Sequence, residues 1–165
     1  MRTKQKLWQF DHEDNVYCVQ LHDTYLITCS ADKSARIWDI ETGKLIHKLA
    51  HSASCGNCDL SPNRTLLAVA SDTAVVLWDF KKATKIKEFK LGELIVDVRF
   101  NRDGTTLVVG LKYGQIFKID LMFDSEGAKT QSKYDEYEEY HEYNENNQSA
   151  KKVSKLAKFF RRLKN

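Results

Sequence analysis

The sequence predicts an all-β protein built from short antiparallel strands. Three observations support this class: runs of four to seven β-favouring residues, turn-forming residues between the runs, and a unit of about 40 residues that recurs along the chain. Within residues 1–133 no stretch keeps a helical period over three turns. Because the strands are short and evenly spaced, we expect antiparallel sheets rather than strands that alternate with helices.

The predicted strands are rich in Val, Ile, Leu, Phe, Trp and Thr, and turn formers such as Thr42-Gly43 and Asp103-Gly104 separate them. The strands lie at 7–10, 16–21, 25–30, 35–40, 44–49, 66–71, 75–80, 85–89, 95–100, 106–110 and 115–121. Alignment of the repeats adds one more strand, in which Cys55, Cys58 and Leu60 take the places of Val16, Val19 and Leu21.

An internal repeat sets the organisation of the first 121 residues. The pair Trp38-Asp39 recurs as Trp78-Asp79 after 40 residues and as Ile119-Asp120 after 41 more. One four-stranded unit cannot bury both of its faces alone, so we expect neighbouring units to stack and shield one another. Each repeat holds four predicted strands, and the three repeats span 4–40, 44–80 and 84–121.

This pattern resembles the WD-repeat family of β-propellers. The first copy is the segment from Ser30 to Asp39 with the upstream His12, and the second offers His51, Ser61-Pro62-Asn63 and Leu77-Trp78-Asp79. The resemblance implies a hydrogen-bond network that links a His, a strand hydroxyl, a turn Asp and the Trp. The residues that it implies are His12, Thr28 or Ser30, Asp32 and Trp38 in the first repeat, and His51, Asp72 and Trp78 in the second.

The network is expected to weaken along the chain. In the second repeat Ala68 and Ala70 stand at the aligned hydroxyl positions, so the link should be broken there. The third repeat aligns Glu93, Tyr113 and Ile119 with the His, the Asp and the Trp, so we expect it to pack by shape alone.

Three repeats are fewer than the four to eight blades of most propellers. Three blades leave sheet edges and apolar faces uncovered. Two interpretations remain: the chain is the C-terminal piece of a longer propeller, or it completes a ring by pairing with another chain. In a closed ring, the outer strand at residues 5–10 would join the preceding blade.

The residues that suggest chemistry have structural explanations. Cys55 and Cys58 form a C-x-x-C, but they occupy aliphatic positions of a predicted strand and, being three apart, should face opposite sides of it. His12, Asp32 and Ser30 are the residue types of a catalytic triad, although the network uses the same types to fasten strands. With seven glycines in the chain and none in a phosphate-binding motif, we expect no enzyme, no cofactor and no metal site.

The tail is divided by charge. Residues 134–149 hold six acidic residues and no Lys or Arg, which predicts a disordered linker (122–149) that is either solvated or an acidic, Tyr-rich docking segment. Residues 150–165 hold seven basic residues and predict an amphipathic helix. Its interaction candidates are Lys151, Lys155, Lys158, Phe160, Arg161 and Arg162. The helix would contact a membrane surface, a calmodulin-like groove or nucleic acid, or else remain solvated or pack on the sheets.

The function that these features indicate is a non-catalytic scaffold or adaptor that binds proteins or peptides. By the family resemblance, residues beside the inner strands would contact a partner, and Arg36 would lie on an exposed strand. These rim candidates are Tyr17, Ala35, Ala53, Ala74, Leu94 and Gln115.

Two alternatives stay open. One is an F-box type ubiquitin-ligase adaptor, which needs an upstream segment, and the other is a lipid- or nucleic-acid-binding protein that acts through 150–165. The N-terminus lacks the apolar stretch of a secretory signal and no window reaches the length of a membrane span, so secreted, collagen-like and integral-membrane proteins are not expected. Four cysteines without a signal indicate a reducing compartment, either cytoplasmic or nuclear.

Overall fold

The computed structural model describes residues 8–121, and the regular structure in this range consists of strands. The strands are β1 (Val16–His22), β2 (Tyr25–Ser30), β3 (Ser34–Asp39), β4 (Lys44–Ala50), β5 (Cys55–Leu60), β6 (Leu66–Ser71), β7 (Ala74–Asp79), β8 (Thr84–Lys90), β9 (Ile95–Phe100), β10 (Thr106–Leu111) and β11 (Ile116–Asp120). Each predicted strand has a counterpart among them except the one at 7–10, where residues 8–10 join no sheet. The all-β prediction is confirmed, and the linker and helix predicted for 122–165 lie outside the described residues.

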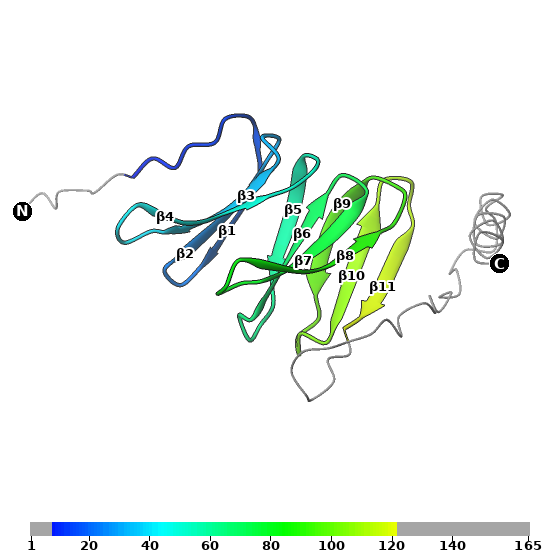
Figure 1. Ribbon diagram of the computed structural model, residues 1–165. Coiled ribbons are helices and arrows are strands. Elements are labelled where there is room, and N and C mark those ends of the chain that lie inside the picture. The colour runs from blue at the N-terminus through cyan, green and yellow to red at the C-terminus, as the bar shows by residue number, and fades with distance from the viewer. Residues whose placement is uncertain (1–7, 122–165) are drawn as a thin grey trace, which may run out of the picture. The chain divides into compact units, whose positions relative to one another are not determined.

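The strands form three antiparallel sheets in which chain neighbours pair (Figure 1). The first sheet has the order β1-β2-β3-β4 and the second β5-β6-β7-β8, whereas the third contains only β9, β10 and β11. The sheets are offset from the sequence repeat by one strand. Strands β4 and β8 open the second and third repeats in the sequence, but they pair with β3 and β7 and so complete the preceding sheets.

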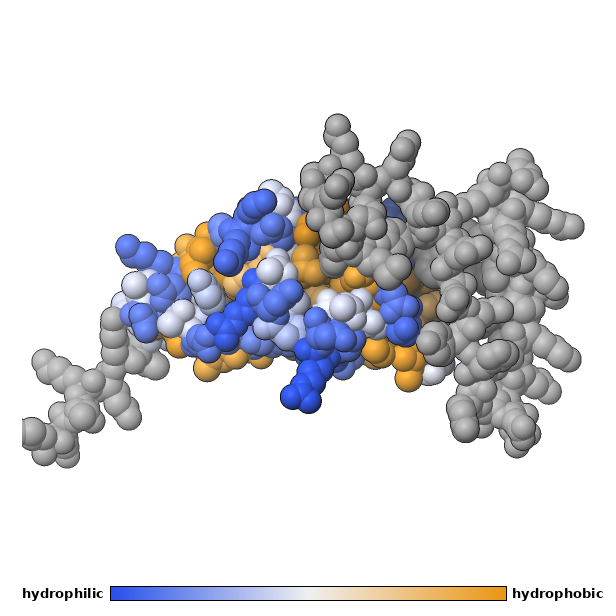
Figure 2. Space-filling view, turned by 90° about the horizontal axis from the view of Figure 1, so that it is seen from below, coloured by the Kyte–Doolittle hydropathy of each residue, from blue (hydrophilic) through white to orange (hydrophobic). Residues whose placement is uncertain are grey.

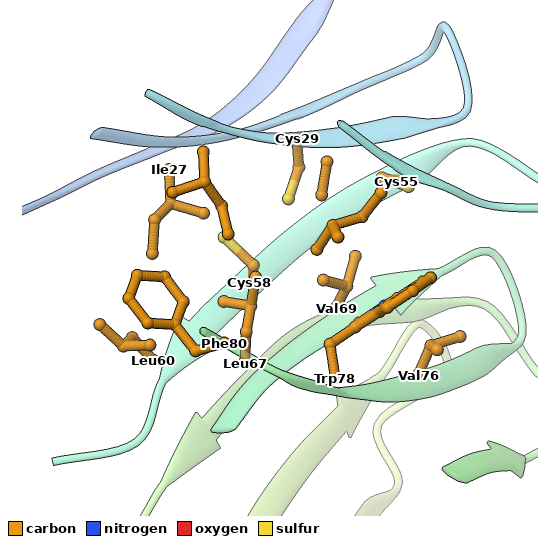
Figure 3. Close-up of a cluster of buried hydrophobic side chains, with 13 residues drawn as sticks. Ile27, Cys29, Cys55, Cys58, Leu60, Leu67, Val69, Val76, Trp78 and Phe80 are labelled. Carbon is orange, nitrogen blue, oxygen red and sulfur yellow. The ribbon is translucent and has the colours of Figure 1, made fainter. Parts of the chain in front are cut away.

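Two apolar clusters lie between the sheets. The first contains Ile27, Cys29 and Ile37 of the first sheet and Cys58, Val69 and Trp78 of the second (Figure 3). The second cluster joins the opposite face of the second sheet to the third. The middle sheet is therefore covered on both faces, and β6 is buried at all six positions. This explains why its sequence, LLAVAS, is a continuous apolar run and shows no alternation.

The aspartate of each Trp-Asp pair fastens the turn that follows it. The Asp39 carboxylate accepts backbone hydrogen bonds from Glu41 (2.8 Å) and Thr42 (3.2 Å). Hydrogen bonds from the backbone N–H groups of Thr42 and Glu41 hold the pKa of Asp39 below its ordinary value. The turn closes at Gly43 in a left-handed conformation (φ 72°), where the missing Cβ leaves room for the Trp8 ring. In the Trp-Asp pair, the tryptophan thus packs in the apolar interior and the aspartate stabilises the turn at the end of the strand.

A β-bulge changes which way the cysteines of the C-x-x-C point. The pairing between β5 and β6 shifts register between Cys55 and Asn57, so the simple alternation of faces is interrupted. Cys55 and Cys58 are both fully buried in the first cluster, on the same face of the sheet. The prediction that they face opposite sides was therefore wrong, because an inserted residue resets the alternation. In residues 8–121 there is no helix with the length and apolarity to cross a membrane.

Candidate functional site

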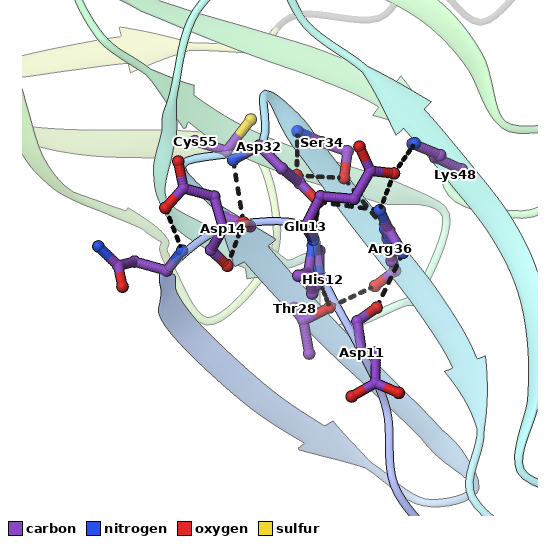
Figure 4. Close-up of polar contacts among 12 residues, drawn as sticks. Asp11, His12, Glu13, Asp14, Thr28, Asp32, Ser34, Arg36, Lys48 and Cys55 are labelled. Carbon is purple, nitrogen blue, oxygen red and sulfur yellow. Dashed lines mark hydrogen bonds and ion pairs between the residues drawn. The ribbon is translucent and has the colours of Figure 1, made fainter.

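A charged network centred on Asp32 joins the start of the chain to the first sheet. The Asp32 carboxylate accepts hydrogen bonds from His12 Nδ1 (2.8 Å), Arg36 (2.8 Å) and the Ser34 hydroxyl (2.6 Å), and also from the backbone N–H groups of Ser34 and Glu13 (Figure 4). Burial raises the pKa of Asp32, but the hydrogen bonds from Ser34 and His12 outweigh it, and the net pKa lies below the ordinary value. Asp32 is therefore a structural carboxylate that stays ionised.

The network continues through His12 to the core tryptophan. Because the Asp32 carboxylate only accepts, His12 Nδ1 donates to it, and His12 Nε2 forms a hydrogen bond with the Thr28 hydroxyl (2.6 Å). The indole N–H of Trp38 donates to the same Thr28 oxygen (2.9 Å). Ser30, the alternative candidate, instead donates to the Asp14 carbonyl (3.1 Å). The residues of the suspected triad thus fasten strands to a loop and do not converge on a substrate site.

Arg36 is a member of this network that the sequence did not reveal. We expected it on an exposed strand, but its residue is only 9% exposed. Its guanidinium donates to the Asp11 carbonyl (2.8 Å), to the Ser34 hydroxyl (3.2 Å) and to Asp32. The available signal was the spacing of Asp32, Ser34 and Arg36 at every second residue, which places side chains on one face of a strand.

The second sheet carries an incomplete version of the network. Strand pairing aligns Val69, and not Ala68, with Thr28, because Cys58 pairs with Val69 as Val19 pairs with Thr28. The hydroxyl is missing as expected, but at a different residue. The sequence alignment failed because it used the 40-residue offset of the Trp-Asp pairs for this strand, whereas the longer turn before β6 raises the offset from 39 (Val19 to Cys58) to 41 (Thr28 to Val69).

The histidine and tryptophan of the second sheet remain without that hydroxyl. Among residues 8–121, neither His51 Nε2 nor Trp78 Nε1 has a hydrogen-bond partner, although both atoms are buried and the two rings lie 5.3 Å apart. Burial and the nearby Lys85 lower the pKa of His51 to about 4. His51 is thus a neutral imidazole in the folded protein at pH 7.

Asp72 does not take the place of Asp32. Its backbone N–H donates to the Ser54 carbonyl (3.1 Å), just as Ala31 donates to Asn15 (2.9 Å), so Asp72 corresponds to Ala31. The turn between β6 and β7 is one residue shorter than the turn between β2 and β3, and the Asp32 position is lost. The Asp72 residue is exposed and has a left-handed backbone (φ 52°).

In the third sheet, apolar residues occupy the network positions. Ile119 lies at the tryptophan position and Val109, which pairs with Val98, lies at the Thr28 position. The counterpart of His51 is Leu91, because both donate a backbone hydrogen bond to the loop before the third strand of the preceding sheet. Glu93 therefore does not stand at the histidine position.

The four cysteines are free thiols packed at the interface of the first two sheets. Cys18 Sγ lies 3.8 Å from Cys58 Sγ, and their hydrogen bond, together with burial, raises the pKa of Cys18. Burial raises the pKa of Cys55 to about 12. A thiol that resists ionisation is a poor nucleophile and a poor metal ligand. Within residues 8–121, no group of three or more His, Cys, Asp or Glu side chains is arranged to hold a metal ion.

One rim of the sheets is a continuous set of hydrogen-bonded loops. Each of these hydrogen bonds joins the loop that leads into a sheet to a turn between second and third strands. The turn belongs either to the same sheet or to the preceding one. These backbone bonds are Ala31 to Asn15, His51 to Lys33, Asp72 to Ser54, Leu91 to Thr73, Ile95 to Asp72 and Lys112 to Leu94, all between 2.9 and 3.1 Å. This rim therefore presents its side chains from a fixed backbone.

The structure separates the rim candidates into two groups. Ala35 and Ala74 are buried, at 0% and 9% exposed, and Ala35 belongs to the apolar cluster between the first two sheets, so these side chains do not reach a partner. Tyr17 and Leu94 are exposed, and Ala53 and Gln115 are half-buried. Tyr113, which the sequence analysis did not select as a rim residue, is 75% exposed on the same rim, where Lys112 lies 5.7 Å from its ring centroid. The tail candidates from Lys151 to Arg162 lie outside the described residues.

Comparisons with known proteins agree with this architecture. The family model "WD domain, G-beta repeat" matches residues 4–39 and 43–79. In the solved structures, the chain is similar to the β-propeller domain of Cps50 (Swd1) from Myceliophteria thermophila, with a TM-score of 0.61 and 21% identity over 68% of this chain and 38% of that one. The third sheet lies beyond the residues that the family model matches, but its three strands pair in the same order as the first three strands of the other two sheets.

Three curated relatives with different names match the chain at 28–29% identity. The chain is 28% identical over 100 residues to the F-box/WD repeat-containing protein sel-10 of Caenorhabditis elegans (52% of this chain) and 29% identical over 119 residues to eukaryotic translation initiation factor 3 subunit I of Neosartorya fischeri (67%). It is 29% identical over 93 residues to small ribosomal subunit protein RACK1y of Oryza sativa (52%). The chain spans 17%, 35% and 28% of the lengths of these three relatives.

Proposed function

Because the chain belongs to the WD40 repeat family, we propose that it is a non-catalytic scaffold that binds other proteins through the loop rim described above. WD40 domains generally bind proteins, and the rim offers what such a surface needs: a rigid backbone with exposed side chains on it. The observation that carries the proposal is the chain of backbone hydrogen bonds that ties neighbouring rim loops together. A surface fixed in advance loses little conformational entropy when a partner binds.

The candidate contact residues are Tyr17, Leu94 and Tyr113, which are 58%, 39% and 75% exposed. Aromatic residues are enriched at the centres of protein interfaces because they bury large areas at low entropic cost. Nearby polar groups form hydrogen bonds within the chain, as in the Asp32 network. They therefore fix the positions of the apolar side chains that would contact a partner.

The proposed role is tested with rim variants of the whole chain. Tyr17→Ala, Leu94→Ser and Tyr113→Ala, each expressed in cells with a matched Ile86→Ser variant on the outer strand β8, are cross-linked and their partners identified by mass spectrometry. We expect partners to be lost from the rim variants and retained by the Ile86 variant. The same partners at the same yield with all four variants would refute a partner site on this rim.

The alternatives concern the assembly and the tail. The match to an F-box/WD repeat-containing protein supports an adaptor in a ubiquitin ligase. A translation initiation factor subunit and a ribosomal subunit protein match at about the same identity. Together these relatives support a general role in protein binding, and they do not favour one assembly over another. The same names support our proposal of a cytoplasmic or nuclear location. Membrane or nucleic-acid binding through 150–165 stays a separate hypothesis, tested by vesicle and RNA binding after deletion of those residues.

A further inference from the structure

The first sheet exposes a face that is buried in the second and third sheets. Val19 is 62% exposed, whereas the residues at the same register position in the second and third sheets, Cys58 and Val98, are 0% exposed. Leu21 is 63% exposed and its counterpart Leu60 is 5% exposed. In the second and third sheets these positions pack against the preceding sheet, so the first sheet presents the same type of face with no sheet on it among the described residues.

The third sheet exposes the complementary face. Ile116 pairs with Gly110 as Val75 pairs with Ala70, and Ile116 is 71% exposed whereas Val75 is 0%. On the same face Val108 is 42% exposed. In the first two sheets this face packs against the next sheet in the chain. Figure 2 shows hydrophobic surface left uncovered among the polar side chains of the described part.

Within residues 8–121, the third sheet also has an unpaired edge strand. Its order ends at β11, whereas the first two sheets continue to an outer strand, β4 or β8. An exposed edge strand is a template for another strand. In the sequence repeat, the segment 7–10 is the counterpart of β4 and β8.

Residues 8–10 are already placed like an outer strand of a preceding sheet. The Phe10 ring packs edge-on against Trp38 with 5.4 Å between ring centroids. Leu49 of β4 lies in the same cluster as Trp78, the counterpart of Trp38. A three-stranded sheet stacked on the Val19 face would therefore bring its free edge beside residues 8–10.

Polar groups at the end of β9 match this arrangement. Gln20 donates to the Cys58 carbonyl of the next sheet (2.6 Å), and Asp59 accepts the Phe100 backbone N–H of the sheet after it (2.7 Å). Arg99 is the residue of the third sheet at this position, and its side chain is 50% exposed. Its guanidinium forms ion pairs with Asp97 (3.1 Å) and with Asp59 of the second sheet (3.8 Å), and the exposed part of the side chain is available to the inner strand of one more sheet.

From these observations we infer that the third sheet of one copy of this chain stacks on the first sheet of a second copy, and that residues 8–10 of the second copy add the fourth strand to β11. A second copy fits because each copy carries both faces, and each face already packs against its complement inside the same chain. Two copies bring two sets of three sheets, and six sheets lie within the four to eight of known propellers. Head-to-tail contacts close into a ring when the rotation returns to the start.

Polar residues interrupt the apolar pattern on this part of the third sheet's face: Thr106 stands at the position of Leu66, and Lys118 stands at the position of Leu77. Lys118 pairs with Val108 as Leu77 pairs with Ala68, and its ammonium lies 2.9 Å from Asp120. The aliphatic stem of a lysine can cover apolar surface while its charge stays at the edge. We therefore expect an interface that forms at micromolar concentrations and is not permanent.

The experiment measures the mass of the whole chain in solution by sedimentation velocity. The proposal predicts a species of twice 19.1 kDa. Val19→Asp and Ile116→Asp each place a charge on one face at an exposed position, so each should give single chains with an unchanged β-sheet circular dichroism spectrum. The matched control is Ile86→Asp on β8, which lies on neither face and should leave the dimer intact.

Mixing the two variants identifies the direction of the contact. The Val19→Asp chain keeps its Ile116 face and the Ile116→Asp chain keeps its Val19 face, so a mixture should form a two-chain species that neither variant forms alone. One contact in place of two should raise the dissociation constant roughly a hundredfold or more. Single chains for the unmodified protein, or a dimer that survives either substitution, would overturn the proposal. The outcome does not depend on the rim, whose variants leave both faces unchanged.

Discussion

The polar network of the first sheet depends on the hydroxyl group of Thr28. It joins His12 to Trp38, so two buried groups depend on one oxygen. In the second sheet Val69 stands at that place, and His51 Nε2 and Trp78 Nε1 are buried without a partner among residues 8–121. Because valine and threonine have nearly the same shape, the two sites form a natural pair of experiments.

We expect Thr28→Val to lower the free energy of unfolding by about 2 kcal/mol, because it leaves two buried groups unpaired. Val69→Thr should raise it by about 1 kcal/mol, because the new hydroxyl can accept from Trp78 and donate to His51. Urea unfolding of both variants and the unmodified chain measures the two changes. Loss of stability in Val69→Thr would contradict the equivalence of Val69 and Thr28.

The buried His51 should make stability depend on pH. Burial lowers the pKa of His51 to about 4, and the unfolded chain has the ordinary value of 6.5. Between these values the unfolded state binds a proton that the folded state does not, so stability falls as the pH falls from 6.5 towards 4. The loss from this residue approaches about 3 kcal/mol, at about 1.4 kcal/mol per pH unit.

Urea unfolding at pH 7, 6 and 5 tests this dependence, with His51→Gln as the control that removes the titrating group. We expect the unmodified chain to lose more stability between pH 7 and pH 5 than the variant does. Equal losses in the two proteins would show that His51 is not a buried neutral group in the folded state.

Among the elements, the N-terminal segment depends on the turn that follows the first Trp-Asp pair. Gly43 has φ 72°, and a Cβ there would lie 2.6 Å from the Trp8 ring. Gly92 has φ 80° but has no heavy atom within 4 Å of its Cβ position. Alanine variants at the two glycines therefore distinguish the cost of backbone strain from the cost of a clash with Trp8.

Gly92→Ala should cost about 1 kcal/mol from the left-handed backbone alone. Gly43→Ala should cost about 1 to 2 kcal/mol more, because the methyl group displaces Trp8 from the first sheet. Urea unfolding gives the free energies, and a red shift of the tryptophan emission should accompany only Gly43→Ala. Identical losses and spectra for the two variants would exclude the packing of Trp8 on this turn.

Strands and turns were largely predictable, because alternation, β-branched runs and turn residues act within a few positions of one another. The alignment of the repeats gave the Trp, the His and the order of strands. It failed where chain length changes locally. The turn before β6 is longer and the turn after it is shorter than in the first sheet, so the hydroxyl position is Val69 and not Ala68; a bulge also placed Cys55 on the same face as Cys58.

The rim could be predicted only in part, because exposure depends on which face meets a neighbour. Ala35 and Ala74 lie at strand starts near the rim, but both are buried. Arg36 is a charged residue in a strand, yet three acceptors allow it to be buried: the Asp11 carbonyl, the Asp32 carboxylate and the Ser34 hydroxyl. The spacing of Asp32, Ser34 and Arg36 indicates a shared face, but it does not indicate which face meets a neighbour.

For the molecule as a whole, sheets stabilise one another across shared faces. Among residues 8–121, the second sheet has a neighbouring sheet on each face, whereas the first and third sheets each have one. In an array of this kind, stability is a sum of sheet and interface terms, so a sheet with two interfaces opens least often. Protection from hydrogen exchange should therefore be highest in the middle of the described chain.

Hydrogen exchange measured by mass spectrometry on the Val19→Asp/Ile116→Asp double variant, in which both end faces are kept open to water, tests whether stacking holds these sheets together. We expect the amides of β6 and β7 to exchange roughly tenfold more slowly than those of β1 and β11. Equal protection in all three sheets, or slower exchange in β1 and β11 than in β6 and β7, would contradict a structure in which each sheet is stabilised by its neighbours.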